Sequence, residues 1–594
     1  MSRLSLALCV LIAAPSAAQA PRITPAGDPS VKSDTIYRLA VNPADYQDQT
    51  FVYLLDDGVL RFEADGRSSR TYRQVVQILS QDAVEGWAEQ SFSYTVGHER
   101  LTVNWVRVLK PDGTVISAQP SREQESLAPV AMEAPVYSDT KVRRVALGGV
   151  APNTLIDYSY TIERLQPNMP GDFFSGWRVT TGRLTRRSRL IVDVPASPLS
   201  WADISRWYAG VSRDRFVLSP EVEREIATVV SGATTLDDSL RALHRWVAQD
   251  FRYVSIALGT GGYVPRLPAQ VLETRYGDCK DKATLFIAAA RRFGVQANPV
   301  LLSSSGGADS TMPTLAQFDH MIAAVERPAG RLYLDLTAEL TPYGELPFAE
   351  QGSFAVVVRP DGTGEPVTLP VDSAGANRSE THLVGDLSAD GMFSGRFTET
   401  SRGAQQYQLR SALARELTPI ERQRFSIALA NELAPGAAGD SLQIFNGRDL
   451  TAQPRISLLV RGARMSRPSG KSDILTLPLR NFASLDVVSR LEAHLPRRFP
   501  IDVGEVVGPV KLVGDFELTL PAGWTADLPP NVSETSEFGS YTAEYVQTGR
   551  LLHVKRTIVG RKGAAPPDRA QALIAWLRAV SKDDVSYIVL QHGQ

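Results

Sequence analysis

The chain has 594 residues, of which 43% are hydrophobic and 22% are charged. This is the composition of a globular protein that is too long for a single core, so about two to four domains are expected. The 63 basic and 65 acidic side chains give a formal net charge of -2. Basic residues do not cluster in a stripe, so the sequence lacks the usual signature of nucleic-acid binding.

Residues 1–20 have the pattern of a secretory signal peptide, with a basic start, an apolar stretch from Leu4 to Ala14 and small residues after it. Cleavage after Ala18 or after Ala20 fits the small-residue rule, and either cut removes Cys9. The apolar stretch is shorter than the ~20 residues of a membrane helix, so an uncleaved anchor is the less favoured alternative. We therefore expect an exported protein with no transmembrane segment in its mature chain.

From about 45 to 215, apolar and polar residues alternate in short runs that predict strands. Residues 156–162 are one such run, and Lys110-Pro-Asp-Gly-Thr114 is typical of a hairpin turn between two others. This segment contains no acid pair, histidine cluster or glycine-rich phosphate loop. We expect a β-sandwich domain of mainly antiparallel strands over 45–215.

The pattern changes near residue 216. Ser219-Pro-Glu221 combines a capping side chain, a proline at the first helical position and an acid in the first turn, which predicts a helix start. A second helix is predicted over residues 236–249, with His244 expected on its solvent side. We assign residues 216–355 to a second domain.

From 356 to 594 the strand patterns return and predict a C-terminal domain that is mainly β. Two helices are expected within it, one that starts at the capping signature Thr418-Pro-Ile-Glu421 and one from about Asp568 to Val580. A terminal strand is expected after the second helix.

Metal and cofactor sites are not expected anywhere in the chain. The seven histidines are scattered, and neither a His-Glu-x-x-His nor a Cys-x-x-Cys pattern occurs. The expected chemistry is therefore that of side chains alone.

Cys279 is the one cysteine left when the signal peptide is removed. Exported proteins usually pair their cysteines in disulfides, so an unpaired thiol indicates a use for its reactivity, with a buried inert thiol as the ordinary alternative. Gly277 allows a sharp turn, Asp278 is a good helix cap, and apolar residues then repeat at helical spacing. Cys279 is thus predicted to begin a buried helix, where unpaired amides and the helix dipole favour a thiolate and an oxyanion.

A histidine and an acid follow in the order that a thiol hydrolase needs. His320 opens the apolar run that ends at Val325, and Asp335 closes the next strand-like run. A hairpin closed across Arg327-Pro328 would pair His320 with Asp335 on adjacent strands. Such an acid fixes the imidazole tautomer while the other ring nitrogen meets the thiol.

These residues resemble the transglutaminase-like superfamily of papain-fold cysteine enzymes. The resemblance rests on Gly277-Asp-Cys-Lys-Asp281, Asp319-His320 and Tyr333-Leu-Asp335, and it covers roughly residues 220–350. It implies a papain-like α+β central domain between the two β regions, with Cys279 as nucleophile, His320 as general base and acid, and Asp335 as its orienting partner.

The same resemblance bears on two supporting residues and on location. By analogy of position Tyr253 is a candidate for an additional oxyanion donor, although an ordinary core tyrosine is the favoured interpretation, and Asp278 supports the helix start. The N-terminal β region resembles the domain of unknown function that precedes such cores in exported bacterial proteins. This implies a bacterial envelope setting, with the periplasm as the expected compartment.

We therefore predict an exported thiol enzyme that cleaves or transfers acyl groups at a peptide or carboxamide bond. Hydrolysis is favoured over cross-linking, because water is the default acceptor unless a site excludes it. The expected partners are a peptide or protein substrate and an envelope partner bound through the β domains. The alternative is a non-catalytic envelope binding or scaffold protein with a degenerate core, and the identity of the substrate stays open.

Overall fold

The computed structural model describes residues 35–127, 136–167, 169–172, 183–194, 199–257, 259–414, 416–477 and 485–593. Residues 1–20, predicted to be a signal peptide, lie outside these ranges. Within them, every helix is too short or too polar to cross a bilayer. The chain divides into two compact units: Met1–Trp207 with Ser255–Val264 and Pro313–Ala316, and Tyr208–Val254 with Pro265–Met312 and Gln317–Gln594.

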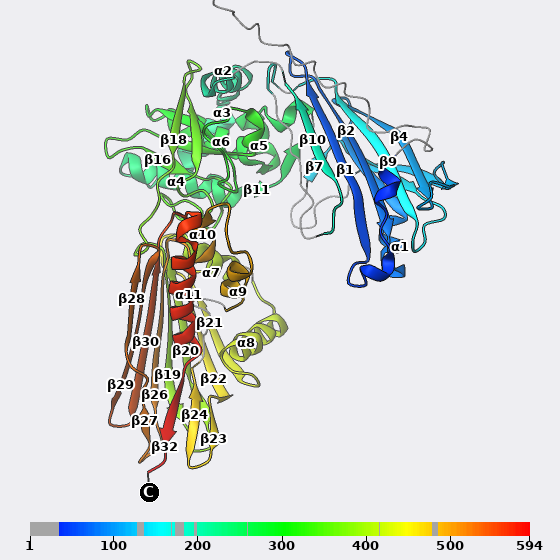
Figure 1. Cartoon of the computed structure of the whole chain (residues 1–594). Helices are drawn as coiled ribbons and strands as arrows, with labels where there is room; N and C mark the ends of the chain where they lie inside the picture. The colour runs from blue at the N-terminus through cyan, green and yellow to red at the C-terminus, as the bar shows by residue number, and fades with distance from the viewer. Residues whose placement is uncertain are drawn as a thin grey trace, which may run out of the picture. The chain divides into compact units, whose positions relative to one another are not determined.

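The first unit is built from strands (Figure 1). Its larger sheet has the order β10-β1-β2-β9-β4-β5, and a smaller one has the order β3-β8-β6. Apolar side chains of both sheets share one core, among them Val108 and Ile156 from the larger sheet and Phe92 and Val145 from the smaller. Most neighbours are antiparallel, but β1 and β10 run parallel, so the larger sheet is mixed.

The elements of the first unit are β1 (Phe51–Phe62), β2 (Ser68–Ile78), α1 (Val84–Trp87), β3 (Glu89–Thr95), β4 (Glu99–Leu109), β5 (Val115–Ser117), β6 (Arg122–Leu127), β7 (Val136–Ser138), β8 (Thr140–Ala146), β9 (Leu155–Arg164), β10 (Ser188–Asp193) and β12 (Ser255–Ala257). The predicted turn between β4 and β5 is confirmed. Lys110 N–H donates to Thr114 O over 2.8 Å, and Gly113 takes the positive φ of 85° that the turn requires.

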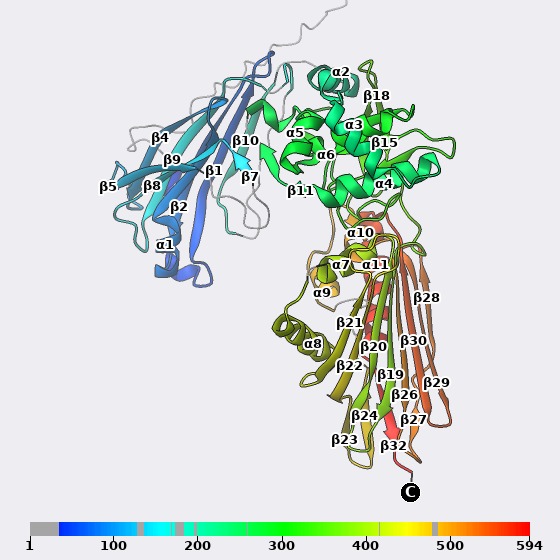
Figure 2. The same cartoon turned by 180° about the vertical axis from the view of Figure 1, so that it is seen from behind.

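The second unit begins with helices around a sheet of order β16-β15-β14-β17-β18. Helix α6 packs against α4, α5, β14 and β15, as Figure 2 shows for the helices. The elements are α2 (Trp201–Ser212), which begins in the first unit, α3 (Pro220–Val229), α4 (Leu236–Asp250), β11 (Arg252–Tyr253), α5 (Pro268–Thr274), β13 (Tyr276–Gly277), α6 (Cys279–Arg291), β14 (Ala297–Leu302), β15 (His320–Val325), β16 (Leu332–Leu334), β17 (Phe354–Val358) and β18 (Gly364–Thr368).

The predicted helix starts are confirmed, but the predicted position of His244 is wrong. Ser219 caps α3, with its hydroxyl accepting the N–H of Val222 over 3.4 Å. His244 is only 2% exposed and its ring meets that of Tyr343, so it points into the protein and not toward solvent. The packing of α4 buries this side of the helix.

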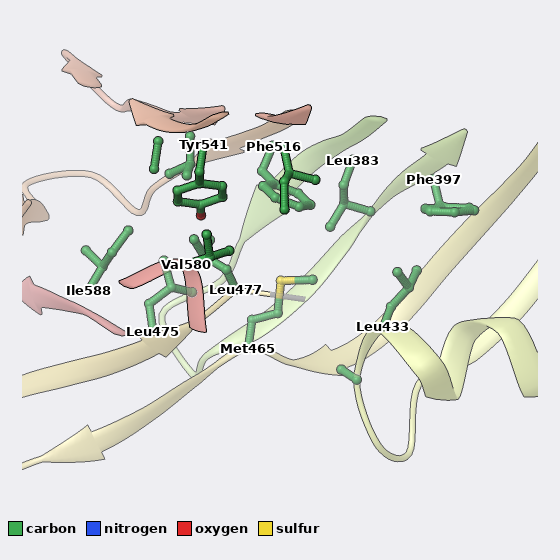
Figure 3. Close-up of a cluster of buried hydrophobic side chains, with 14 of the residues drawn as sticks. Leu383, Phe397, Leu433, Met465, Leu475, Leu477, Phe516, Tyr541, Val580 and Ile588 are labelled. Carbon is green, nitrogen blue, oxygen red and sulfur yellow. The ribbon is translucent and has the colours of Figure 1, made fainter. Parts of the chain in front are cut away.

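The same unit continues with a long sheet of order β21-β22-β20-β19-β26-β30-β29-β28 and a smaller one of order β23-β24-β32-β27. Helix α11 lies over one face of the long sheet (Figures 1 and 2). Figure 3 shows side chains of the long sheet, such as Phe516 and Tyr541, packing with Val580 of α11 and Leu475 of the smaller sheet.

The elements of this part are β19 (Arg378–Leu387), β20 (Met392–Arg402), α7 (Gln405–Leu413), α8 (Pro419–Leu433), β21 (Ala438–Phe445), β22 (Arg455–Arg464), β23 (Ser466–Ser469), β24 (Ser472–Thr476), α9 (Leu485–Ala493), β25 (Ile501–Asp502), α10 (Val503–Val506), β26 (Lys511–Thr519), β27 (Thr525–Asp527), β28 (Val532–Ser536), β29 (Gly539–Thr548), β30 (Leu551–Gly560), β31 (Ala564–Ala565), α11 (Ala570–Asp584) and β32 (Tyr587–Gln591). Both predicted helices are present as α8 and α11. The expectation of only two helices is wrong, because α7, α9 and the short α10 are present as well. The side chain of Asp502 caps α10, whereas α7 has no side-chain cap bond. The whole is a multidomain α+β protein with several sheets.

Candidate active site

The start of α6 is fixed by a network of charged side chains around Cys279. Asp278 Oδ1 accepts the N–H of Asp281 over 3.2 Å, and Asp281 Oδ2 accepts the N–H of Asp278 over 3.4 Å, which is a capping box. Arg266 donates to Asp281 from its backbone N–H over 2.7 Å and from Nε over 2.9 Å. Lys280 pairs with Asp278. The acids beside the thiol therefore hold the helix start, and Cys279, as predicted, is its first residue.

Gly277 is required by a close approach. A Cβ at this position would lie 2.7 Å from the Cβ of Asp281, too close for any side chain. Its strand, β13, runs parallel to β11 and pairs Gly277 with Tyr253. Tyr253 is 37% exposed, so the favoured prediction of an ordinary core tyrosine is wrong. Its part in oxyanion binding stays a prediction.

The hairpin of β15 and β16 differs in register from the prediction. Val325 pairs with Leu332, so the strands are shifted by two residues and Asp335, just past β16, continues toward a place opposite Ile322. The pairing of His320 with Asp335 is therefore wrong, because the loop is longer than a turn over Arg327-Pro328. A shift of two residues leaves every side chain on its face of the sheet, and Asp335 Oδ1 still lies 3.3 Å from His320 Nε2.

His320 stands between the thiol and two carboxyl groups. It is hydrogen-bonded to Cys279, and its side chain is 9% exposed. Burial alone would lower the pKa of His320, but the charge of Asp335 and hydrogen bonds to Asp335, Cys279 and Glu350 raise that pKa well above its ordinary value. The site therefore favours an imidazolium beside the sulfur.

Asp335 is held as a carboxylate. Burial would raise its pKa, but the positive charge of His320 and the hydrogen bonds that Asp335 accepts lower it well below its usual range. Thr337 contributes two of these bonds to Oδ1, from its N–H and its hydroxyl, each over 2.8 Å. Cys279 is partly exposed, whereas Asp335 is buried.

Two residues near Cys279, His320 and Asp335 carried no signal in the sequence. Glu350 Oε1 lies 3.5 Å from His320 Nε2, although Glu350 stands alone in a loop segment without any motif. Tyr208 of α2 donates from its hydroxyl to Met321 Sδ over 2.8 Å. Burial raises the pKa of Tyr208 well above its ordinary value, and the negative charge of Cys279 adds to this effect. Only the tertiary fold brings these two side chains to the site.

The described ranges contain two groups of side chains that could bind a metal ion. Within each group the potential ligand atoms lie within 4.8 Å of one another. The groups are His320 with Asp335 and Glu350, and Asp515 with Glu517 and His553. Hydrogen bonds to His320 explain the first group. In the second, His553 Nε2 is 2.7 Å from Asp515 Oδ1, and Lys555 Nζ is 3.9 Å from the other oxygen of that carboxylate. We assign no metal to either group.

Three family models match this chain. Residues 224–321 match the transglutaminase-like superfamily. Residues 64–213 and 497–590 match two domains of unknown function with solved structures, DUF3857 and DUF3858. The central segment of this chain therefore belongs to the transglutaminase-like superfamily and is flanked by these two domains. The central match includes Cys279 and His320 and ends before Asp335.

Solved structures give a second comparison. A proposed protease from Parabacteroides distasonis is 13% identical, with 91% of this chain and 99% of that chain covered and a TM-score of 0.58. At this identity the likeness establishes a shared fold alone. A proposed cysteine protease from Cytophaga hutchinsonii is 12% identical over 51% of this chain and 86% of that chain, and its TM-score of 0.19 supports no argument. No curated protein matches the chain.

Proposed function

We propose that this chain is an exported thiol enzyme of the periplasm that cleaves or transfers acyl groups at a peptide or carboxamide bond. The observation that carries the proposal is the hydrogen bond between Cys279 and His320, with Asp335 3.3 Å behind the imidazole. Membership of the central segment in the transglutaminase-like superfamily supports it. In this proposal a papain-like domain over 216–355 is flanked by β-sandwich domains over 45–215 and 356–594. The two flanking domains bind the substrate protein or an envelope partner.

The proposed reaction begins with the thiolate of Cys279. Its sulfur forms a bond to the carbonyl carbon, and the carbonyl oxygen takes up negative charge. The N–H of Cys279 and the hydroxyl of Tyr253 are the donors that we assign to this oxyanion. His320, which has taken the thiol proton, gives it to the leaving amine, and the carbon–nitrogen bond breaks to leave a thioester.

Resolution of the thioester decides between hydrolysis and transfer. In hydrolysis, His320 takes a proton from water, the hydroxide adds to the thioester carbon, and the sulfur leaves as a thiolate while His320 keeps that proton. In cross-linking an amine takes the place of water and every other step is shared. We favour hydrolysis, because water is the default acceptor. Asp335 holds the imidazole in orientation and stabilises the imidazolium at each stage in which His320 carries the proton.

The proposal is tested by alkylation of the full chain with iodoacetamide at about pH 6. A free thiol is almost wholly protonated at this pH, whereas a thiolate–imidazolium pair stays reactive. Wild type should therefore be alkylated at least about tenfold faster than His320→Ala. Cys279→Ser gives the background. Equal rates for wild type and His320→Ala would overturn the proposal and favour a binding protein with a degenerate core. Comparison of envelope peptides and cross-links from cells with wild type and with Cys279→Ala then identifies the substrate.

A further inference from the structure

A second buried carboxyl group, that of Glu350, lies behind the imidazole of His320. Glu350 is 3% exposed, and its backbone N–H donates to Pro347 O over 3.1 Å, which fixes the turn that carries it. Its Oε1 is 3.5 Å from His320 Nε2, and its carboxyl is hydrogen-bonded to Asp335, whose Oδ1 is 3.3 Å from the same nitrogen. One ring nitrogen and two carboxyl groups thus share the protons of a buried site.

Hydrogen-bond donors are divided unequally between the two carboxyl groups. Asp335 accepts two bonds from Thr337 as well as facing His320. Glu350 Oε2 is buried and has no hydrogen-bond partner within the described ranges. A buried carboxylate oxygen without a donor is costly, and a neutral carboxyl group costs far less. Asp335 therefore keeps the charge, and Glu350 keeps the proton.

Three other titratable groups interact electrostatically with Asp335, the first member of this pair of carboxyl groups. They are Lys282 of α6, His244 of α4 and Tyr407 of α7. Lys282 directs its Nζ to two backbone carbonyls at 2.9 and 3.1 Å, and burial lowers the pKa of His244 to about 4, so that His244 is neutral. None of the three donates to Glu350 among the hydrogen bonds of the described residues.

Electrostatics agree with this division of protons. Burial, followed by the negative charge of Asp335, raises the pKa of Glu350 to about 8. Two carboxyl groups that share a site seldom ionise together, because like charges in a buried place repel strongly. Glu350 is therefore neutral near pH 7 and charged in alkaline solution.

We propose that Glu350 is a positioning residue of the thiol site, a neutral acid that donates its proton to Asp335 and on ionisation becomes a second anion beside His320. The inference rests on the proposed function, since it needs the pair of Cys279 and His320. Neutral Glu350 draws part of the charge of Asp335 away from the imidazolium, which lets His320 release its proton to the leaving amine. After Glu350 has lost its proton to solvent, two carboxylates hold the imidazolium and this step slows.

The test is the pH profile of iodoacetamide alkylation on the full chain, from about pH 5 to about pH 10. In wild type, the alkylation rate should reach a plateau while the thiolate–imidazolium pair is present. The rate should rise a second time at higher pH, when His320 loses its proton. Glu350→Gln carries a neutral amide of the same shape, so its rate at about pH 6 should equal that of wild type. Its second rise should lie about one pH unit lower, because the second anion is missing.

Two further variants sharpen the comparison. Glu350→Asp keeps an ionisable group, so its second rise should lie nearer to that of wild type than the rise of Glu350→Gln does. Glu345→Gln is the matched control, because Glu345 is a half-buried acid of the same segment that accepts from Gln406 over 2.9 Å. Its profile should equal that of wild type.

The outcomes separate the two proposals. Superimposed profiles of wild type and Glu350→Gln would overturn this inference and leave the thiol site standing. A wild-type profile equal to that of His320→Ala would overturn the proposed function itself. A wild-type profile that changes on addition of EDTA would also overturn the inference, because a bound cation would then neutralise Glu350. Should Glu350→Gln fail to fold, the comparison of Glu350→Asp with wild type decides, and equal profiles there count against the inference.

Discussion

Asp335 reaches His320 as a diagonal neighbour in the hairpin and not as the residue directly opposite. Its Oδ1 lies 3.3 Å from His320 Nε2, although the register of β15 and β16 carries Asp335 toward Ile322. Thr337 holds the same oxygen with two hydrogen bonds of 2.8 Å. The carboxylate is thus fixed before any substrate binds, and the imidazole is aligned between it and Cys279.

Replacement of this carboxylate by an amide should weaken the thiol site without changing its shape. In Asp335→Asn, the pKa of His320 should fall, since the charge of Asp335 is what offsets its burial. We expect alkylation of Cys279 at about pH 6 to slow about tenfold or more, since each unit of pKa is a factor of ten in population. The rate constant with iodoacetamide measures this.

Asp361→Asn is the matched control for that variant. Asp361 accepts from Thr363 N–H over 2.8 Å and from its hydroxyl over 2.6 Å, the same local pattern as Asp335, but it is exposed and lies on another hairpin. This control should react like wild type. An unchanged rate in Asp335→Asn would contradict the role of the carboxylate.

Gly277→Ala should disrupt the start of α6, since the new methyl group would lie 2.7 Å from the Cβ of Asp281. Overpacking of this kind costs roughly 1–3 kcal/mol, and the displaced cap should also reduce thiol reactivity. Urea denaturation and the alkylation rate measure the two effects. Gly210→Ala is the control, because a Cβ in this exposed turn of α2 meets no atom within 4 Å. It should be neutral or stabilise the protein by about 0.5–1 kcal/mol.

Helix starts were the most predictable features of this chain, because their signals are local. Ser219, Asp278 and Thr418 each cap the helix that their neighbourhood predicts, and the side chains that accept the bonds lie within one turn. The position of Cys279 at the head of a buried helix followed from the same local rule. A capping box needs no knowledge of the rest of the fold.

Features set by distant contacts were not predictable. The register of the β15–β16 hairpin depends on a loop whose length the sequence does not reveal, although the two-residue shift left Asp335 on the correct face. The burial of His244 depends on what packs over α4. Glu350 comes to His320 from a loop without a periodic pattern, so only the tertiary fold identifies it.

Arg266 should be essential to the stability of the helix start. Its partner Asp281 is a carboxylate with only 1% of its side chain exposed, and Arg266 is itself 23% exposed. Arg266→Gln would leave this charge buried and unpaired, which typically costs about 3–5 kcal/mol. Urea denaturation should show the loss. Arg224→Gln breaks the pair with Glu221, in which both side chains are more than half exposed, and should cost less than about 1 kcal/mol. Similar losses in the two variants would contradict this account.

His244 should make the folded protein sensitive to acid. Burial lowers the pKa of His244 from 6.5 to about 4, despite the opposing charge of Asp335. Between these pH values the unfolded chain binds a proton that the folded chain does not, so stability is lost as the pH falls from about 6.5 toward about 4. The shift corresponds to about 3 kcal/mol over this range.

His244→Gln removes this titration and keeps a polar side chain of similar size. Its free energy of unfolding in urea should fall less than that of wild type between about pH 6.5 and about pH 4.5, even if it is lower than wild type at neutral pH. His494→Gln is the control, because His494 is exposed and its ring nitrogen Nδ1 lies 2.7 Å from Arg490 O at the end of α9. The same acid dependence in wild type and His244→Gln would show that other groups govern the loss. A reduced dependence in His244→Gln alone would assign it to the proton that buried His244 cannot accept.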